Sequence, residues 1–223
     1  MELTRAISER KSYRAFKPDP VPLDILKKIM EQALRAPSWA NTQPWEFAVA
    51  TGKELGEIQK GFLEAQKKGQ EPKPDVPRPY DFPEPYMSRI RAGQPKDRRE
   101  FTPEEWAARI ADNFRHYGAT TCIYLLIGRK FLYQEKGTNL WALYDCGAVM
   151  QNIMLLATSY GLGTVAQAMA VSYPDVIRNV LKIPESKVIA LGMTIGYPDE
   201  KSPLFKSRTQ REPLDKIATF YGF

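Results

Sequence analysis

The sequence predicts a single globular domain that mixes α-helices with β-strands. Residues 23–36 repeat their apolar side chains at the period of a helix. Residues 45–50 alternate between apolar and polar side chains, as a half-buried strand does. Residues 120–127 form a continuous apolar run bounded by Gly118 and Gly128, which suggests a central strand. The length of 223 residues fits one domain, with room for a large insertion.

The first half of the chain predicts four helices and one strand. Pro22 lies near the start of the helix at 23–36, and Pro37 stops it. Trp45 opens the strand, so residues 43–45 are expected to be scaffold. The remaining segments are a short amphipathic helix at 2–9, an extended basic stretch at 10–16, a polar helix at 53–67 and a helix at 103–114.

The second half is dominated by a long helix at residues 140–160, which is apolar on most of its sides. Such a helix is buried, either in the centre of the domain or in a subunit interface. Gly161 provides the stop of this helix. After it we expect the segment 164–170, a helix near 174–181 and a strand at 187–195.

Two regions depart from this pattern of regular elements. Residues 68–103 hold eight of the eighteen prolines, and we interpret the region at about 68–112 as a lid-like excursion over the surface. A disordered linker is the alternative, and the aromatic side chains Tyr80, Phe82, Tyr86 and Phe101 argue mildly against it. The region at about 201–223 is basic and then apolar, and we expect a C-terminal arm.

Composition and charge narrow the possible environments and partners. The net charge of +6 suits anionic small molecules, and no stretch matches a known nucleic-acid module, so we expect no nucleic acid. No apolar run reaches the length of a membrane span, the N-terminus lacks a signal peptide, and a cytoplasmic location is expected without membrane association. Cys122 and Cys146 lie in apolar stretches and are expected to be buried thiols rather than a disulfide or a ligand pair.

Several enzyme chemistries are disfavoured by the residues present. His116 is the single histidine, so metal clusters and histidine-based triads are not expected, and His116 itself is expected at a helix end or in packing. Residues 161–163 read Gly-Leu-Gly but follow a helix and lack a third glycine, so they are not a dinucleotide-binding turn. No catalytic residue is predicted, which leaves chemistry that a bound cofactor performs.

Three distant segments carry a resemblance to a known family. They are RKSYRAF at residues 10–16, APSWANTQPWEF at 36–47, and a third that includes Asp145, QNIMLLA at 151–157, GLGT at 161–164 and LGMTIGYPD at 191–199. Together they resemble the FMN-dependent nitroreductase family, over most of the chain. Pro85-Tyr86, Arg89 and Asn113-Phe114 are most similar to its nitrobenzoate-reductase-like branch.

The resemblance implies one nitroreductase-like domain over residues 1–223, an α+β sandwich with a mainly antiparallel sheet flanked by helices. It also implies an intertwined homodimer with two FMN molecules at the subunit interface. The C-terminal arm would then cross the partner subunit.

The resemblance assigns FMN-binding roles to residues from both ends of the chain. Arg10, Lys11 and Ser12 are expected at the phosphate and ribityl chain, where arginine suits phosphate through its planar fork. Arg208 and Arg211 are expected to close the phosphate site, with Lys206 left open because the register is uncertain. The alternative is a solvated basic tail. Arg14 is expected to stabilise the reduced flavin electrostatically.

Further residues are assigned by the same resemblance. Pro37, Ser38, Trp39 and Asn41 would come from the partner subunit and line the flavin, although Trp39 could be simple interface packing. Tyr86 and Arg89 would face the substrate from the excursion. Alignment with the family places four more residues along the flavin, which are Gly163, Gln167, Ala168 and Met169. In this stretch the chain departs from better known members.

The implied activity is transfer of electrons from NADH or NADPH through FMN to a nitroaromatic, quinone or similar small acceptor, by a ping-pong scheme. Three alternatives stay open at this point: another flavin reaction of the family (reductive dehalogenation or flavin fragmentation), an FMN-binding protein without turnover, and nucleic-acid binding through the net charge. The basic residues of the excursion would suit an acceptor that bears a carboxylate.

Overall fold

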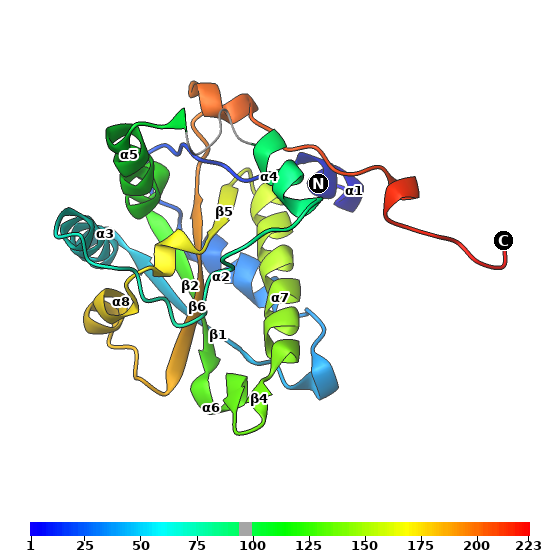
Figure 1. Ribbon diagram of the computed structural model, residues 1–223, viewed down its shortest axis with the longest axis horizontal. Helices are drawn as coiled ribbons and strands as arrows, with labels where there is room; N and C mark the ends of the chain where they lie inside the picture. Colours follow the sequence, from blue (N-terminus) through cyan, green and yellow to red (C-terminus); the bar gives the residue numbers. More distant parts are fainter. Residues whose placement is uncertain (94–99) are drawn as a thin grey trace.

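A four-stranded sheet in the order β1-β2-β6-β5 runs through the centre of the protein (Figure 1). The computed structural model describes residues 1–93 and 100–223. The strands are β1 (Trp45–Thr51), β2 (Thr121–Gly128), β5 (Gly163–Gln167) and β6 (Lys187–Gly196). Every neighbouring pair in this sheet is antiparallel, which confirms the predicted α+β class and the mainly antiparallel sheet.

Helices cover both faces of the sheet (Figure 1). The α-helices are α1 (Leu3–Glu9), α2 (Leu23–Ala33), α3 (Gly52–Lys67), α4 (Tyr86–Ala92), α5 (Pro103–Phe114), α6 (Arg129–Leu132), α7 (Leu140–Ser159) and α8 (Pro174–Leu181). One hydrophobic core lies between the sheet and the helices α2 and α7. A second lies between the opposite face and the helices α3, α5 and α8. Strand β2 is therefore buried on both faces, as its continuous apolar run predicted.

Short elements complete the chain. They are the hairpin strands β3 (Tyr133–Gln134) and β4 (Gly137–Thr138) and the 3-10 turns η1 (Trp39–Asn41), η3 (His116–Gly118), η4 (Met169–Val171), η5 (Pro203–Lys206) and η6 (Leu214–Lys216).

The predicted elements agree with the structure except at a few places. The helix predicted at 23–36 ends at Ala33, because the chain turns before Pro37 and the residue before a proline disfavours helix. Helix α4 lies inside the excursion and was not predicted, and neither were α6 and the β3–β4 hairpin. The helix at 103–114 was predicted at its observed bounds, and a reciprocal capping box between Thr102 and Glu105 fixes its start.

The start of the excursion is attached to the sheet by a largely buried carboxylate. Asp75 Oδ2 accepts hydrogen bonds from Arg178 Nη2 at 2.6 Å and from the backbone N–H of Ile189 at 2.8 Å. The Arg129 guanidinium lies 3.5 Å from the other oxygen of Asp75. This part of the excursion is therefore held against the start of β6. The excursion predicted at about 68–112 also includes residues 94–99, which lie outside the described residues.

Helix α7 is the element that bears on the expectation that no segment spans a membrane. Its 20 residues are long and apolar enough to cross a bilayer, by length and composition alone. The core helix of a soluble protein passes the same test. One side of α7 packs into the first core, whereas Leu140, Trp141 and Tyr144 near its start are exposed.

The end of the C-terminal arm leaves the body of the protein (Figure 1). After η6 the chain projects away from the sheet and helices, and its large apolar side chains are exposed. They are Leu214, Ile217, Phe220, Tyr221 and Phe223. The two cysteines, in contrast, are free and buried, as predicted.

Candidate functional site

The N-terminal basic segment lies as an extra strand along the outer edge of β5. Ser12 forms a parallel bridge with Thr164, and the N–H of Tyr13 donates to the Thr164 carbonyl at 3.0 Å. The N–H of Phe16 donates to the Tyr117 carbonyl at 3.1 Å. Side chains of an extended chain alternate between its two sides, so Arg10, Ser12 and Arg14 face away from the side that Tyr13 takes.

This close approach depends on the absence of a side chain at Gly163. A Cβ built there would lie 2.7 Å from Cδ2 of Tyr13 and 2.8 Å from Cγ of Pro198. Carbon atoms of real Cβ contacts essentially never come so close. The glycine that opens β5 therefore allows the basic segment to reach its place.

Gly163→Ala should destabilise the protein by about 1–3 kcal/mol, the usual cost of overpacking, and should displace the segment at residues 10–14. Urea unfolding would measure the loss of stability. Gly56→Ala is the matched control, because a Cβ there meets nothing within 4 Å and alanine favours helix α3 by up to about 1 kcal/mol. Equal stability of the two variants would contradict the close approach at Gly163.

The C-terminal arm folds back over the same basic segment. The ammonium of Lys11 donates to the Phe205 carbonyl and lies 4.5 Å from the centre of the Phe205 ring. The rings of Tyr13 and Phe205 also stack, with centroids 5.9 Å apart. These contacts hold the residues after η5 beside the N-terminal segment.

A cavity of about 590 Å³ lies between these two segments and α7. This volume is within the range of small-molecule sites, roughly 300–1,000 Å³. The residues that line it are Ile7, Arg10, Lys11, Ser12, Arg14, Gln151, Ser207, Arg208, Thr209 and Arg211. All six residues that were predicted at the cofactor from the two ends of the chain are thus together, and Lys206 is not among the lining residues.

The cavity concentrates positive charge. Partial burial lowers the pKa of Arg10 below its ordinary value, and the nearby charges of Arg211 and Arg208 lower it further. Burial likewise lowers the pKa of Lys11, with a further effect of Arg208. Burial is thus the main cause of both shifts, and repulsion between the cations adds to it.

The carboxylates nearest in sequence to this cluster are engaged by other cations. Arg5 pairs with Glu9 at 2.7 Å, and Glu212 pairs with Arg89 at 3.1 Å and with Lys216 at 3.8 Å. Within residues 1–93 and 100–223, no ion pair joins a carboxylate to any of the four arginines of the cavity, Arg10, Arg14, Arg208 and Arg211. Uncompensated arginines that converge on one cavity suit a phosphate group, which they bind through charged hydrogen bonds.

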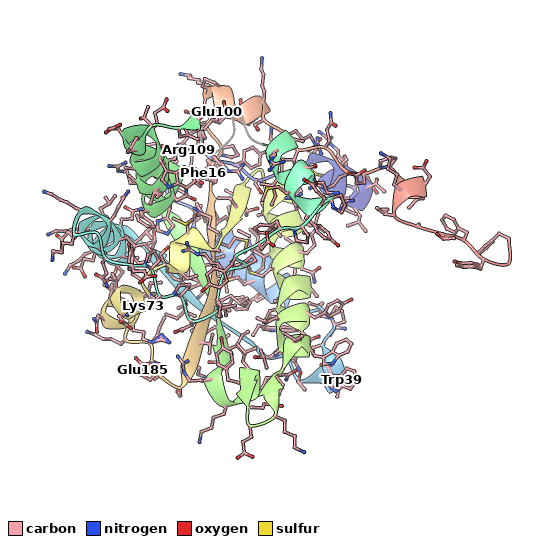
Figure 2. The ribbon with its side chains drawn as sticks, viewed as in Figure 1. Phe16, Trp39, Lys73, Glu100, Arg109 and Glu185 are labelled. Carbon is pink, nitrogen blue, oxygen red and sulfur yellow. The ribbon has the colours of Figure 1, made fainter. Side chains whose placement is uncertain are left out.

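The loop with Pro37, Ser38, Trp39 and Asn41 lies elsewhere. The ring of Trp39 stacks on Trp141, with centroids 5.1 Å apart. Gln151, which lines the cavity, is ten residues further along α7, about 15 Å at the helical rise of 1.5 Å per residue. Figure 2 shows Trp39 at the end of α7 remote from α1. One protomer therefore does not bring this loop to its own cavity.

Strand β5 begins with Gly163 beside the N-terminal basic segment, and the side chain of Gln167 at its end turns inward. Its Oε1 accepts a hydrogen bond from Thr194, and its Nε2 lies 3.4 Å from Asn113 Oδ1. The hydroxyl of Tyr117 donates to the same Oδ1 at 2.7 Å. Gln167 can therefore offer a ligand only backbone groups. Ala168 is exposed and Met169 is half-buried at the end of the strand.

The two expected substrate residues lie on α4. Tyr86 is exposed, and the Arg89 guanidinium lies 5.6 Å from the centre of its ring. Arg89 also pairs with Glu212 in the C-terminal arm, at 3.1 Å. The structure therefore places the charge of Arg89 in an ion pair between the excursion and the arm.

His116 is a packing residue at the end of α5, as predicted. Its side chain is fully buried, and its Nδ1 lies 3.4 Å from Nε2 of Gln59. Burial lowers the pKa of His116 from 6.5 to about 4, partly offset by a hydrogen bond to the Phe114 backbone. The buried ring is therefore neutral at pH 7.

This lowered pKa predicts a loss of stability in acid. The unfolded chain takes up the proton near pH 6.5, whereas the folded protein resists it down to about pH 4. The contribution of neutral His116 to the free energy of unfolding is complete above pH 6.5 and declines as the pH falls to 4. It amounts to about 3 kcal/mol at 1.36 kcal/mol per pKa unit. Denaturant unfolding should show that His116→Asn loses less stability between pH 7 and pH 4.5 than the wild-type protein does. Asparagine is chosen because it tolerates the left-handed backbone at this position. If the variant and the wild-type protein lose equal stability between these pH values, the lowered pKa of His116 is not the cause of the loss.

Three polar lining residues were not singled out from the sequence. Gln151 and Asn152 form a polar pair in the middle of a mostly apolar helix, and this contrast is a signal that could have drawn attention to Gln151. Ser207 and Thr209 flank Arg208 and add hydroxyl groups to the cavity. Only the fold shows that these hydroxyls face the basic N-terminal segment.

Known proteins of similar sequence and structure bear on this site. A sequence model described as "Nitroreductase family" matches residues 7–197. The 4-nitrobenzoate reductase of Nocardioides sp. (strain LMS-CY) is 30% identical, over 95% of this chain and 86% of its own. The nitrobenzene nitroreductase of Ectopseudomonas oleovorans is also 30% identical, over 96% and 94%. The structure of the FMN and NADPH-dependent nitroreductase NfnB from Sphigopyxis sp. strain HMH superposes with a TM-score of 0.86, at 27% identity and full coverage of both chains.

Proposed function

Because this chain belongs to the nitroreductase family, we propose that it is an FMN-dependent oxidoreductase that uses NADH or NADPH to reduce a nitroaromatic, a quinone or a similar small acceptor by a ping-pong scheme. The single observation that carries this proposal is the cavity in which four arginines converge, with no carboxylate of residues 1–93 and 100–223 in an ion pair with any of them. Two of the related proteins are named as reductases of 4-nitrobenzoate and of nitrobenzene, and the structural relative NfnB is named as dependent on FMN and NADPH.

The residues of the cavity fit the polar end of FMN. Arg10, Arg208 and Arg211 would hold the phosphate, since a hydrogen bond between charged groups contributes about 1.5–3 kcal/mol. Ser12 and Gln151 supply neutral polar groups that suit the hydroxyls of a ribityl chain. When bound, FMN supplies the redox chemistry, accepting electrons from the nicotinamide and passing them to the acceptor.

Arg14 would place a fixed positive charge beside the flavin ring. It lies two residues along the extended segment from Ser12, on the same side, and therefore further along the cavity than Arg10. A charge that is held in place before electrons arrive stabilises the negative charge that develops on the ring. No side chain of the chain is assigned the role of general acid or base in this proposal.

We also propose that the enzyme is a homodimer in which each cavity is completed by the loop at residues 37–41 of the partner subunit. The separation of about 15 Å along α7 between this loop and its own cavity supports the proposal. The exposed Trp39, Trp141 and Tyr144 form an apolar surface, and such surfaces mark sites of association. The apolar end of the C-terminal arm would pack across the partner subunit.

The excursion at about 68–112 would act as a lid over the acceptor. The ion pair between Arg89 and Glu212 connects its helix α4 to the arm that lines the cavity. Tyr86, exposed on the same helix, would contact the acceptor. A cytoplasmic location is proposed, since the two free thiols suit a reducing compartment.

The test is an absorption spectrum followed by turnover measurements. The purified protein, supplied with FMN, should show a bound flavin spectrum and sediment as a dimer. It should oxidise NADH or NADPH when 4-nitrobenzoate, nitrobenzene or a quinone is added. Protein that refuses FMN, or that binds it tightly as a monomer, would refute the site. Bound FMN without turnover of any of these acceptors would refute the enzymatic role.

A further inference from the structure

The loop at residues 38–43 has an unusual backbone. Ala40, Asn41 and Gln43 have positive φ angles of 46°, 58° and 45°. Residues with a side chain enter this left-handed region at a cost of about 1–2 kcal/mol each. Three of them in one short loop persist only where the surrounding structure holds them, and such strain is concentrated at functional sites.

The loop is held in part by its own hydrogen bonds. The N–H groups of Asn41 and Gln43 donate to Ser38, to its carbonyl at 3.1 Å and to its Oγ at 3.0 Å, and the N–H of Thr42 donates to the Trp39 carbonyl at 2.9 Å. The amide Nε2 of Gln43 donates to the Oδ1 of Asn41 at 3.2 Å and to its carbonyl at 3.3 Å. The side chains of Trp39 and Asn41 remain exposed. These bonds lie within the loop, so the position of the loop on the protein depends on what it contacts elsewhere.

Helix α7 provides that contact through Asp145. Its carboxylate Oδ2 accepts a hydrogen bond from the N–H of Trp39 at 3.0 Å. The ring of Trp39 rests on Trp141, one turn earlier on the same helix. The loop is thus attached to α7 at one backbone group and one ring.

Asp145 is an expensive residue to place here. Asp145 is only 4% exposed. A buried carboxylate is unfavourable unless it is paired or hydrogen-bonded. Across residues 1–93 and 100–223 no ion pair with Asp145 is formed, so backbone donors such as Trp39 N–H must stabilise it. An apolar residue would pack in this helix at lower cost, so the carboxylate is explained by the loop it fixes.

We infer that Asp145 is a positioning residue, whose buried carboxylate fixes the loop at 37–43 in the shape in which this loop completes the cofactor site of the partner subunit. The inference rests on the proposed function, because the loop has a ligand to meet only in the FMN-bound dimer. Asp145 is not among the residues that line the cavity. Its effect on binding would be exerted entirely through the loop.

The experiment measures FMN affinity and stability for three variants of the full chain. Apo-protein would be titrated with FMN, and thermal unfolding would be followed in parallel. Asp145→Ala should weaken FMN binding by roughly 10-fold or more, the size expected when a charged hydrogen bond is lost. Asp145→Asn keeps an oxygen that accepts from Trp39 N–H and should restore most of the affinity.

The matched control is Val149→Ala, one turn further along α7. Val149 is fully buried in the core beside Cys146 and Ile153 and does not contact the loop. Its truncation should lower the unfolding temperature without weakening FMN binding. If Val149→Ala weakens FMN binding as much as Asp145→Ala, general softening of α7 explains the effect and the positioning role is overturned.

Mixed dimers test whether the loop acts on the partner subunit. Asp145→Ala protomers keep an intact cavity, whereas protomers with Arg208→Ala and Arg211→Ala keep an intact loop. A mixed dimer contains one protomer of each kind. It has one site with an intact cavity and an intact loop only if the loop serves the partner's cavity. Mixing the two should restore tight FMN binding, and no restoration in purified mixed dimers would overturn the inference.

Wild-type protein separates this inference from the proposed function. If wild-type protein does not bind FMN, the proposed function fails and the inference with it. If wild-type protein binds FMN tightly and Asp145→Ala binds it equally well, only the positioning role is overturned.

Discussion

Replacing Arg208 and Arg211 together by alanine is expected to weaken FMN binding by roughly 10²- to 10⁴-fold, because each charged hydrogen bond to the phosphate contributes about 1.5–3 kcal/mol. Both side chains line the cavity and raise the positive potential at Arg10. Neither is engaged by a carboxylate within the described residues. The Arg211 guanidinium instead donates to the Thr209 hydroxyl at 2.9 Å, which orients it without neutralising its charge.

The measurement is equilibrium titration of apo-protein with FMN and, in parallel, with riboflavin. The double variant should lose affinity for FMN but little affinity for riboflavin, which lacks the phosphate. Lys206→Ala is the matched control, since Lys206 carries the same charge on the same arm and does not line the cavity. An equal loss with Lys206→Ala would attribute the effect to net charge. An equal loss for riboflavin would contradict contact with the phosphate.

The basic residues at the two ends of the chain were predicted to lie together, and the structure brings them to one cavity. Arg10, Ser12 and Arg14 alternate along an extended segment, and this period places all three on one side wherever the segment lies. The position of Arg208 and Arg211 followed only from the family resemblance, because nothing in a basic tail shows where it folds. The structure adds the physical reason, which is the contact of Lys11 with Phe205.

The sequence did not reveal the distant contacts that the predicted site residues make. Gln167 was placed along the flavin by alignment, yet its side chain is buried against Thr194 and Asn113, from other elements of the chain. Arg89 is in an ion pair with Glu212, 123 residues later in the sequence. Local patterns carry no information about such pairs, whereas they set the period of α2 and the apolar run of β2.

The excursion shows the same limit for the fold. Its prolines and charges suggested a surface loop, and its helix α4 of only seven residues is too short for a periodic pattern. Asp75 looked like one of many charged residues in that stretch. Its partners Arg178 and Ile189 lie more than 100 residues later, and only the folded chain brings them together.

Asp75→Ala is expected to destabilise the protein by about 3–5 kcal/mol, the usual cost of removing one partner of a buried ion pair. The side chains of Asp75 and Arg178 are only 12% and 6% exposed. Truncation leaves the Arg178 charge buried, with Glu185, a mostly exposed carboxylate at 3.3 Å, as its remaining ion-pair partner. It also removes the acceptor of the Ile189 N–H. Urea unfolding of the apo-protein would measure the change.

The control for this change is Asp112→Ala, which removes an exposed carboxylate 3.5 Å from Arg115 and should cost less than about 1 kcal/mol. A combined Asp75→Ala and Arg178→Met variant should recover part of the loss, because no unpaired charge then remains buried. If Asp75→Ala costs no more than Asp112→Ala, the ion pair does not fasten the excursion to the sheet. If the expected loss is found, limited proteolysis of Asp75→Ala should cut the chain at residues 68–85 before the sheet unfolds. The reason is that loss of the ion pair with Arg178 releases the excursion first.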